Sequence, residues 1–142
     1  MERYKDNGPG PIPATPSTVQ HPRLTLSDYS EALRLPMPFL QELGVLNPDA
    51  AGVVLRIPFR DTSNNDVGAQ TVRRMVESDD AATWRVLWEP SGKRLPYGLW
   101  RMRDAKDMGF ICVVRHPWEA QTLWLHGIPA VAIANVDCWA ET

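Results

Sequence analysis

The residues best suited to chemistry lie in one short segment between two apolar runs. Arg115 and His116 follow the first run, and Glu119 falls in the first turn of the helix expected next. Open α/β sheets bind ligands at the carboxyl ends of strands, and helix N-termini attract anions, so Arg115 and His116 form a candidate phosphate-binding pair. The alternative is a plain surface turn. The histidines have no metal-motif spacing, so we expect His126 to cap a helix C-terminus and no metal or cofactor to be bound.

A second candidate site is a set of cations in the middle of the chain. The net charge is −2, but residues 52–118 hold 11 basic and 8 acidic side chains, whereas both ends are acidic. This asymmetry permits a basic face on an acidic protein. The predicted nucleic-acid-binding residues are Arg56, Arg60, Arg73, Arg74, Arg85, Lys93, Arg94, Arg101 and Arg103. The alternative is that these arginines and lysines are solvated side chains on exposed strand faces.

Tryptophans accompany these cations. Trp84, Trp88 and Trp100 would stack on bases, as aromatic side chains do in proteins that bind single strands. A short domain also needs large apolar side chains to fill its interior. The alternative interpretation therefore places most of the six tryptophans in the core.

The elements that position these residues begin with a helical hairpin. Residues 1–23 are rich in proline and glycine and offer little to bury, so they are predicted to form a disordered arm. Thr25 and Asp28 have the spacing of a capping box and predict a helix over residues 26–35. A second short helix over residues 39–43 follows, bounded by prolines before it and a glycine after it.

A change to period-two alternation predicts a small antiparallel sheet. Its strands are expected at residues 53–60, 67–76 and 83–88, with turn-forming residues between them. Arg73 and Arg74 fall on opposite faces of the second strand. Pro58 is unsuited to a central strand, so the first strand is expected at an edge or a bulge.

The last third of the chain alternates apolar strands with helices. A helix is predicted over residues 100–108 and another over 118–126, with apolar strands at 110–114 and 130–133. This order is typical of a parallel, right-handed βαβ unit. The predicted fold is therefore α/β (α+β). A helical hairpin and antiparallel sheet occupy residues 24–96, and a βαβ lobe occupies residues 97–142.

Residues 97–133 resemble the primase type of Toprim domain. The resemblance rests on Tyr97-Gly98-Leu99 before a helix, an apolar strand, and the run Leu-Trp-Leu-His-Gly-Ile-Pro-Ala-Val at residues 123–131. The hairpin and first strand resemble the lead-in of Toprim-containing primases and primase–helicases of phages and mobile elements. The resemblance implies that the C-terminal lobe is a truncated Toprim-like lobe.

The chain departs from the family at the positions that carry its chemistry. In the family the first strand ends in Glu-Gly-x-x-Asp, but here Arg115 stands at the glutamate and Glu119 at the aspartate. The family's downstream Asp-x-Asp motif, which would bind Mg²⁺ through oxygen ligands, does not occur before Thr142. We therefore expect no catalysis by the isolated chain.

These observations favour a catalytically degenerate primase-related domain of a phage or mobile element. Its expected partner is single-stranded nucleic acid or a replication or defence protein. The alternatives are a protein-binding inhibitor of a host nucleic-acid enzyme, for example an anti-defence protein, and one half of a split primase. Without an apolar span or leader, the expected location is cytoplasmic, with no membrane contact. An open sheet edge past residues 130–133 would allow a homodimer that buries Trp139.

Overall fold

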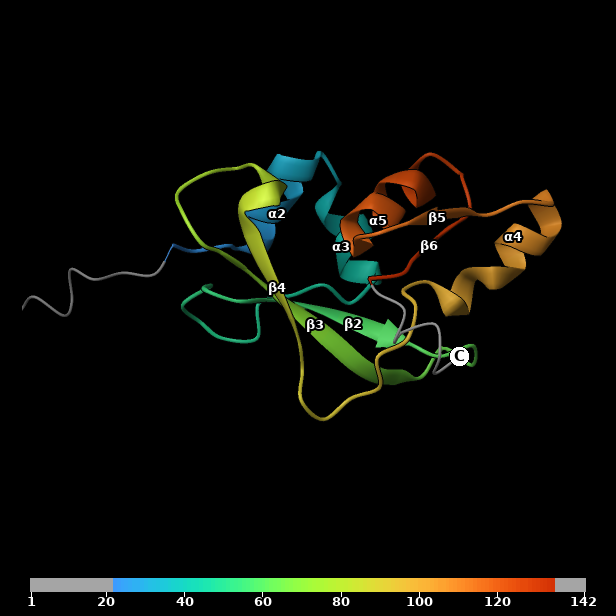
Figure 1. Ribbon diagram of the computed structural model, residues 1–142. Helices are drawn as coiled ribbons and strands as arrows, with labels where there is room; N and C mark the ends of the chain where they lie inside the picture. Colours follow the sequence, from blue (N-terminus) through green and yellow to red (C-terminus); the bar gives the residue numbers. More distant parts are fainter. Residues whose placement is uncertain (1–21, 135–142) are drawn as a thin grey trace, which may run out of the picture.

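The computed structural model describes residues 22–134 and has an α+β fold, so the predicted mixture of helix and sheet is confirmed. The helices are α2 (Leu26–Leu33), α3 (Met37–Glu42), α4 (Met102–Met108) and α5 (Pro117–Leu125). The strands are β2 (Leu55–Arg60), β3 (Asp66–Arg74), β4 (Trp84–Trp88), β5 (Cys112–Val114) and β6 (Ala130–Ala132). Helices α2, α3 and α5 lie above the β2-β3-β4 sheet, and α4 lies at one end of the molecule (Figure 1). Trp139 and most of the predicted arm lie outside the described residues.

The predicted helical hairpin is present, with α2 shorter than expected. The Thr25 hydroxyl accepts a hydrogen bond from the backbone amide of Asp28 at 3.0 Å, and the Asp28 carboxylate accepts one from the amide of Thr25 at 3.1 Å, which completes the capping box. The helix ends at Leu33 because Arg34 adopts a left-handed conformation with φ 57°. Gly44 closes the hairpin at φ +82°, where an added Cβ would lie 2.8 Å from the Pro58 ring.

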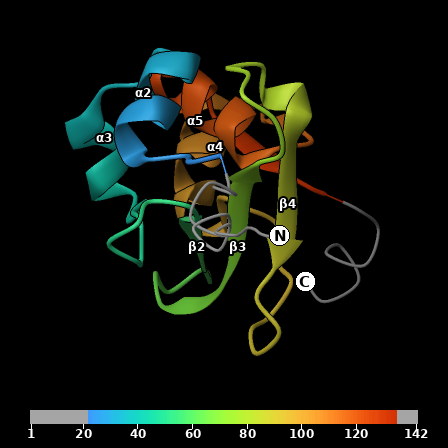
Figure 2. The same cartoon turned by 90° about the vertical axis from the view of Figure 1, so that its left-hand side faces the viewer.

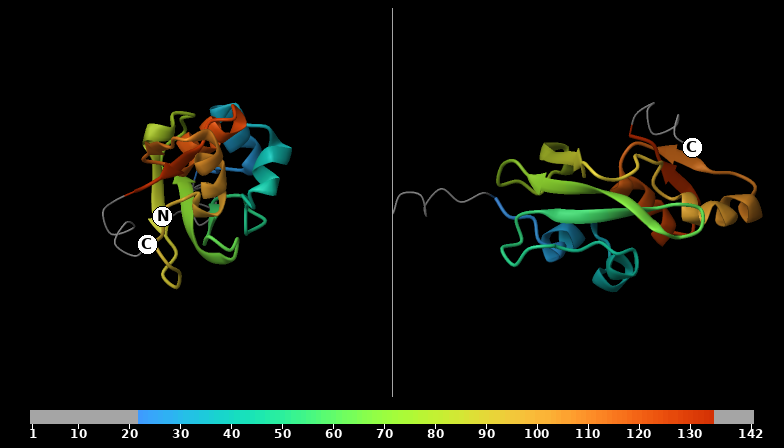
Figure 3. Two further views of the ribbon diagram at one scale, coloured as in Figure 1. Left: turned by 90° about the vertical axis from the view of Figure 1, so that its right-hand side faces the viewer. Right: turned by 90° about the horizontal axis from the view of Figure 1, so that it is seen from below.

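The antiparallel sheet has the order β2-β3-β4, so β2 is an edge strand as Pro58 predicted. Strand β3 ends at Arg74, two residues before its predicted end, because the chain bends at residues 75–77. Side chains such as Leu55, Ile57 and Val72 are fully buried on the face toward the helices. Seen from below, β2 and β3 lie in front of the helices, so no helix covers the opposite face of these strands (Figure 3). Pro58 and Ala69 on that face are nevertheless buried.

The predicted parallel strand–helix–strand unit is also present. Strands β5 and β6 pair in parallel, and α5 connects them. The helix predicted over residues 100–108 begins as a 3₁₀ turn, η2 (Leu99–Arg101), before α4. A second 3₁₀ turn, η1 (Ala81–Thr83), precedes β4. His126 is the C-terminal cap of α5, as predicted, and its Nδ1 lies 2.9 Å from the Thr122 carbonyl oxygen.

Strand β6 does not have the open edge that was expected. The backbone amide of Tyr97 donates to the Ala132 carbonyl at 2.8 Å, and the Ala132 amide donates to the Tyr97 carbonyl at 2.9 Å. The Trp124 indole N–H donates to the Ala130 carbonyl at 3.0 Å. Among residues 22–134 the unpaired edge of this small sheet is therefore β5, where Val113 is 63% exposed.

One hydrophobic core joins the N-terminal hairpin, the antiparallel sheet and the parallel unit. It extends from Leu24 to Ala132, with residues from both sides of the predicted boundary at 96/97. At its centre the Tyr29 hydroxyl donates to Gln121 Oε1 at 2.6 Å, and Gln121 Nε2 donates to the Tyr97 hydroxyl at 3.0 Å. Helices α2 and α5, which carry Tyr29 and Gln121, lie side by side (Figures 1 and 2).

Replacement of Tyr29 with Phe tests this hydrogen-bond chain. The variant leaves Gln121 Oε1 buried without its donor, so the free energy of unfolding should fall by about 1–3 kcal/mol. Urea denaturation followed by circular dichroism measures the change. Ser27→Ala, an exposed position on the same helix, should change the free energy of unfolding by less than about 0.5 kcal/mol. Equal effects of the two substitutions would contradict this account.

Candidate nucleic-acid interface

The face of the antiparallel sheet that points away from the helices, here called the outer face, carries some of the predicted cations. Strand register places Arg56, Thr71 and Leu87 in one row across β2, β3 and β4, and Arg73 directly opposite Arg85 in another. Leu87 belongs to the first row, lies next to the Arg73–Arg85 row, and is 46% exposed. Arg73 and Arg85 make no ion pair with any described carboxylate. Since like charges directly opposite each other destabilise a sheet, this pair favours an anion as its partner.

The other arginines of the sheet have partners within the described chain. The Arg56 guanidinium hydrogen-bonds Glu89 at 2.8 Å and lies 3.5 Å from Asp66, and the contact with Glu89 raises its pKa. The Arg74 side chain, only 10% exposed, lies on the opposite face and pairs with Asp79 at 3.4 Å. The Arg60 guanidinium lies 5.6 Å from the centre of the Trp100 ring.

The remaining predicted cations are dispersed. Lys93 and Arg94 are exposed in the loop after β4, and Arg103 is exposed on α4. The Arg101 guanidinium lies 4.5 Å from the centre of the Trp124 ring. The structure therefore brings Arg73 and Arg85 together but does not place all nine cations on one face.

Among the described tryptophans, the side chains fill the interior to different extents. Trp84, Trp118 and Trp124 are no more than 7% exposed, while Trp88 and Trp100 are half-buried against the same core. Trp84 packs on Tyr29 with ring centres 5.6 Å apart and on Trp118 with centres 5.5 Å apart. Trp84 is thus a core residue, whereas Trp88 is only partly buried.

A groove separates the inner side of β3 and β4 from the start of α5. It has a volume of about 250 Å³ and is lined by Gln70, Val86, Trp88, Arg115, His116, Pro117 and Ala134. Gln70 is only 3% exposed, and its Oε1 has no hydrogen-bond partner among residues 22–134. Sequence reasoning missed Gln70. The sequence held one sign of it: Gln70 lies two residues before Val72 in the predicted strand, so its polar side chain falls on the same, inward face as the apolar residues.

The start of α5 organises the other wall of this groove. The Glu119 carboxylate accepts hydrogen bonds from the backbone amides of Arg115 at 3.1 Å and His116 at 2.8 Å. These amides are therefore occupied by Glu119, and a phosphate here would be contacted by the Arg115 and His116 side chains. The His116 ring lies flat on Trp118, with ring centres 4.5 Å apart, and burial lowers the pKa of its imidazole.

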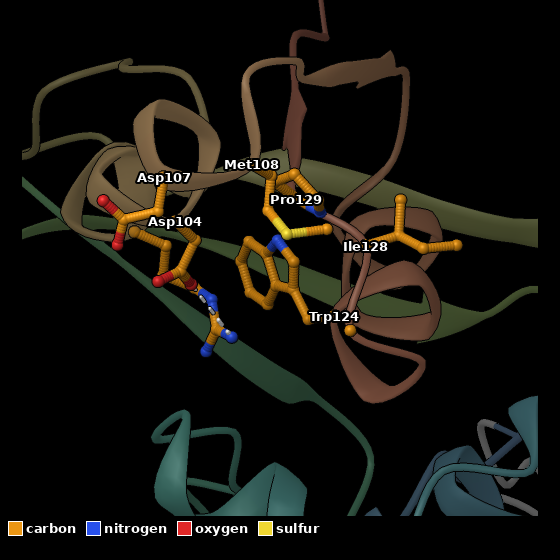
Figure 4. A pocket seen from close by; sticks show the side chains of 8 residues that line it. Asp104, Asp107, Met108, Trp124, Ile128 and Pro129 are labelled. Carbon is orange, nitrogen blue, oxygen red and sulfur yellow. Dashed lines mark ion pairs between the residues drawn. The ribbon is translucent and has the colours of Figure 1, made fainter.

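A separate pocket lies between α4 and the end of α5. It has a volume of about 310 Å³, and Figure 4 shows Trp124 in its middle, with Asp104 and Asp107 on one side and Ile128 on the other. Arg101 pairs with Asp104 at 3.6 Å and offsets its charge, whereas Asp107 adds a further negative charge, so the rim is acidic.

Residues 22–134 contain no group of three His, Cys, Asp or Glu side chains placed to hold a metal ion. None of the helices in this part of the chain is long and apolar enough to cross a membrane.

The lowered pKa of His116 predicts a pH-dependent stability. As the pH falls below about 6.5, the unfolded chain binds a proton at this histidine before the folded chain does. The stabilisation by neutral His116 is therefore present above about pH 6.5 and is lost as the pH falls toward the folded pKa. His116→Phe keeps the flat contact with Trp118 and should reduce the loss of unfolding free energy between about pH 7.5 and 5.5. The same slope in both proteins would show that another group is responsible.

Comparison with known proteins gives one weak structural similarity. No protein-family model matches the chain, and no curated protein matches it at a significant level. The fold is similar to that in the crystal structure of the Aquifex aeolicus primase, covering its zinc-binding and RNA polymerase domains, with a TM-score of 0.44 and 16% sequence identity. The match covers 79% of this chain and 30% of that chain. A similarity of this size does not establish a family.

Proposed function

We propose that this chain is a primase-related domain that binds single-stranded nucleic acid through the Arg73–Arg85 pair and performs no phosphoryl transfer itself. The relation to primases of phages or mobile elements rests on the Toprim-like sequence of residues 97–133. The absence of catalysis rests on the cation at Arg115, where the family has its glutamate. The observation that carries the binding function is the cross-strand register of Arg73 and Arg85 on the outer face.

The surroundings of this pair favour a single strand over a duplex. Arg73 and Arg85 are direct partners on adjacent strands, so both guanidinium groups can reach one nucleic-acid backbone, and exposed Leu87 offers an apolar surface beside them. An unstacked base can cover that apolar surface, whereas a duplex keeps its bases inside. Electrostatic contacts to phosphate supply most of the affinity in such complexes.

A protein partner is the second candidate. Phe110 is 48% exposed and Val113 is 63% exposed at the unpaired β5 edge. Such an edge accepts an extended segment of another chain by strand addition. A replication or defence protein, a host enzyme that the domain inhibits, or the other half of a split primase would each use this edge.

Fluorescence anisotropy with a labelled single-stranded oligonucleotide tests the nucleic-acid proposal. Combined Arg73→Ala and Arg85→Ala should weaken binding and reduce the slope of log K against log salt by about 1.4, since each phosphate contact contributes about 0.7. Removal of the like-charge pair should also stabilise the sheet by about 0.2–1 kcal/mol.

Lys106→Ala supplies the matched control, because Lys106 is an exposed cation on α4, away from the outer face. Its salt slope should equal that of the wild type. Equal slopes in the arginine double variant and the wild type would exclude this face as the binding site. If the wild type does not bind at low salt, the protein-partner candidate is favoured instead.

A further inference from the structure

We propose that the groove between β3, β4 and the start of α5 binds one nucleotide, with the base against Gln70 and Trp88 and the phosphate on Arg115. This site goes beyond the function proposed above. Gln70 and Arg73 are three residues apart on β3 and therefore point to opposite faces of the sheet. The groove and the Arg73–Arg85 pair are thus separate sites.

Gln70 provides the strongest reason to expect a ligand. Its Cα partners in the sheet are Ile57 on β2 and Trp88 on β4, so the amide lies in an otherwise apolar row. An acceptor that is buried without a hydrogen bond costs about 1–3 kcal/mol. Gln70 Oε1 is such an unpaired, buried acceptor, and Gln70 is one of the residues that line the groove. A ligand with an N–H donor would satisfy it once the amide turns toward the groove, because Oε1 itself is closed to solvent in the free protein.

The walls of the groove favour a planar ligand. Trp88 is half-buried, with its ring held edge-on to Phe59 at a centre-to-centre distance of 4.7 Å. The flat contact with Trp118 fixes the His116 ring across the groove. Two oriented aromatic rings suit a nucleobase, because every base has a π-face for stacking and at least one N–H donor.

The mouth of the groove favours an anionic group. Arg115 is exposed there, and Glu119 is held by backbone amides at the helix start. The volume of about 250 Å³ is just below the range of about 300–1,000 Å³ typical of small-molecule pockets, so it suits one nucleotide but not two. The pocket of Figure 4 differs, because its lining carries two carboxylates, Asp104 and Asp107, against one guanidinium, Arg101, and this excess of negative charge disfavours a phosphate.

A nucleotide in this groove has two possible sources, a free nucleoside monophosphate or the terminal residue of a strand. Calorimetric titration distinguishes them, with the full chain titrated with AMP, GMP, CMP and UMP. The Arg73→Ala and Arg85→Ala double variant, which lacks the outer-face pair, is titrated with a short oligonucleotide with and without a 5′-phosphate. Binding of free nucleotides indicates the first source. Binding only of the 5′-phosphorylated oligonucleotide indicates the second, and either result supports the site.

Two substitutions in the groove and one outside it locate the binding. Gln70→Leu keeps the volume of the side chain and removes the amide, so it should weaken nucleotide binding about tenfold without lowering the melting temperature of the free protein. Arg115→Ala should weaken it by about tenfold or more through loss of a charge-assisted contact. Arg73→Ala with Arg85→Ala should leave mononucleotide binding unchanged, which separates this site from the outer face.

Two results would overturn the proposal. One is the lack of binding of any of these nucleotides or of the phosphorylated oligonucleotide at millimolar concentration. The other is equal affinity of Gln70→Leu and the wild type for a nucleotide that binds. Both results leave the function proposed for the outer face intact, because that function is measured by the Arg73 and Arg85 variants.

Discussion

The buried hydrogen-bond chain from Tyr29 through Gln121 to Tyr97 is the interaction on which the arrangement of the other elements depends. It joins α2, the loop before η2, and α5, and its two hydrogen bonds span sequence separations of 92 and 24 residues. A buried amide is tolerated only if its donors and acceptors are satisfied, so Gln121 restricts how these elements pack. Tyr97 also pairs with Ala132 through its backbone, which places β6 relative to the antiparallel sheet.

This packing leaves one face of the antiparallel sheet without a helix over it. The aromatic side chains of the core gather on the helix side, where Phe59, Tyr97 and Trp124 form successive ring contacts. The outer face then carries the charged half of the strand alternation, and the register decides which charges meet. Arg56 meets Glu89, whereas Arg73 meets Arg85, so positive charge without a described acidic partner is confined to one part of the sheet.

Local patterns in the sequence predicted the elements well because each pattern has a local cause. The capping residues of α2, the alternation in β2 and the edge position of Pro58 depend on neighbours within a few residues. The site residues were less predictable. Whether Arg73 opposes Arg85 depends on strand register, and the position of Gln70 on the wall of a groove depends on α5, more than 40 residues away. Helix ends such as Arg34 also depended on a left-handed backbone that the sequence did not indicate.

The residues at the end of β5 illustrate how one substitution can invert the ligand class of a site. By resemblance, a carboxylate at position 115 would attract a cation, but Arg115 makes the same position attractive to anions. Glu119, the remaining carboxylate, is held by the amides of Arg115 and His116 and stabilises the start of α5. The fold therefore keeps the strand–helix junction that presents a ligand site while the charge at that junction is reversed. A binding function for phosphate-containing ligands is compatible with this geometry, and residues 22–134 provide no carboxylate-based metal site at the same junction.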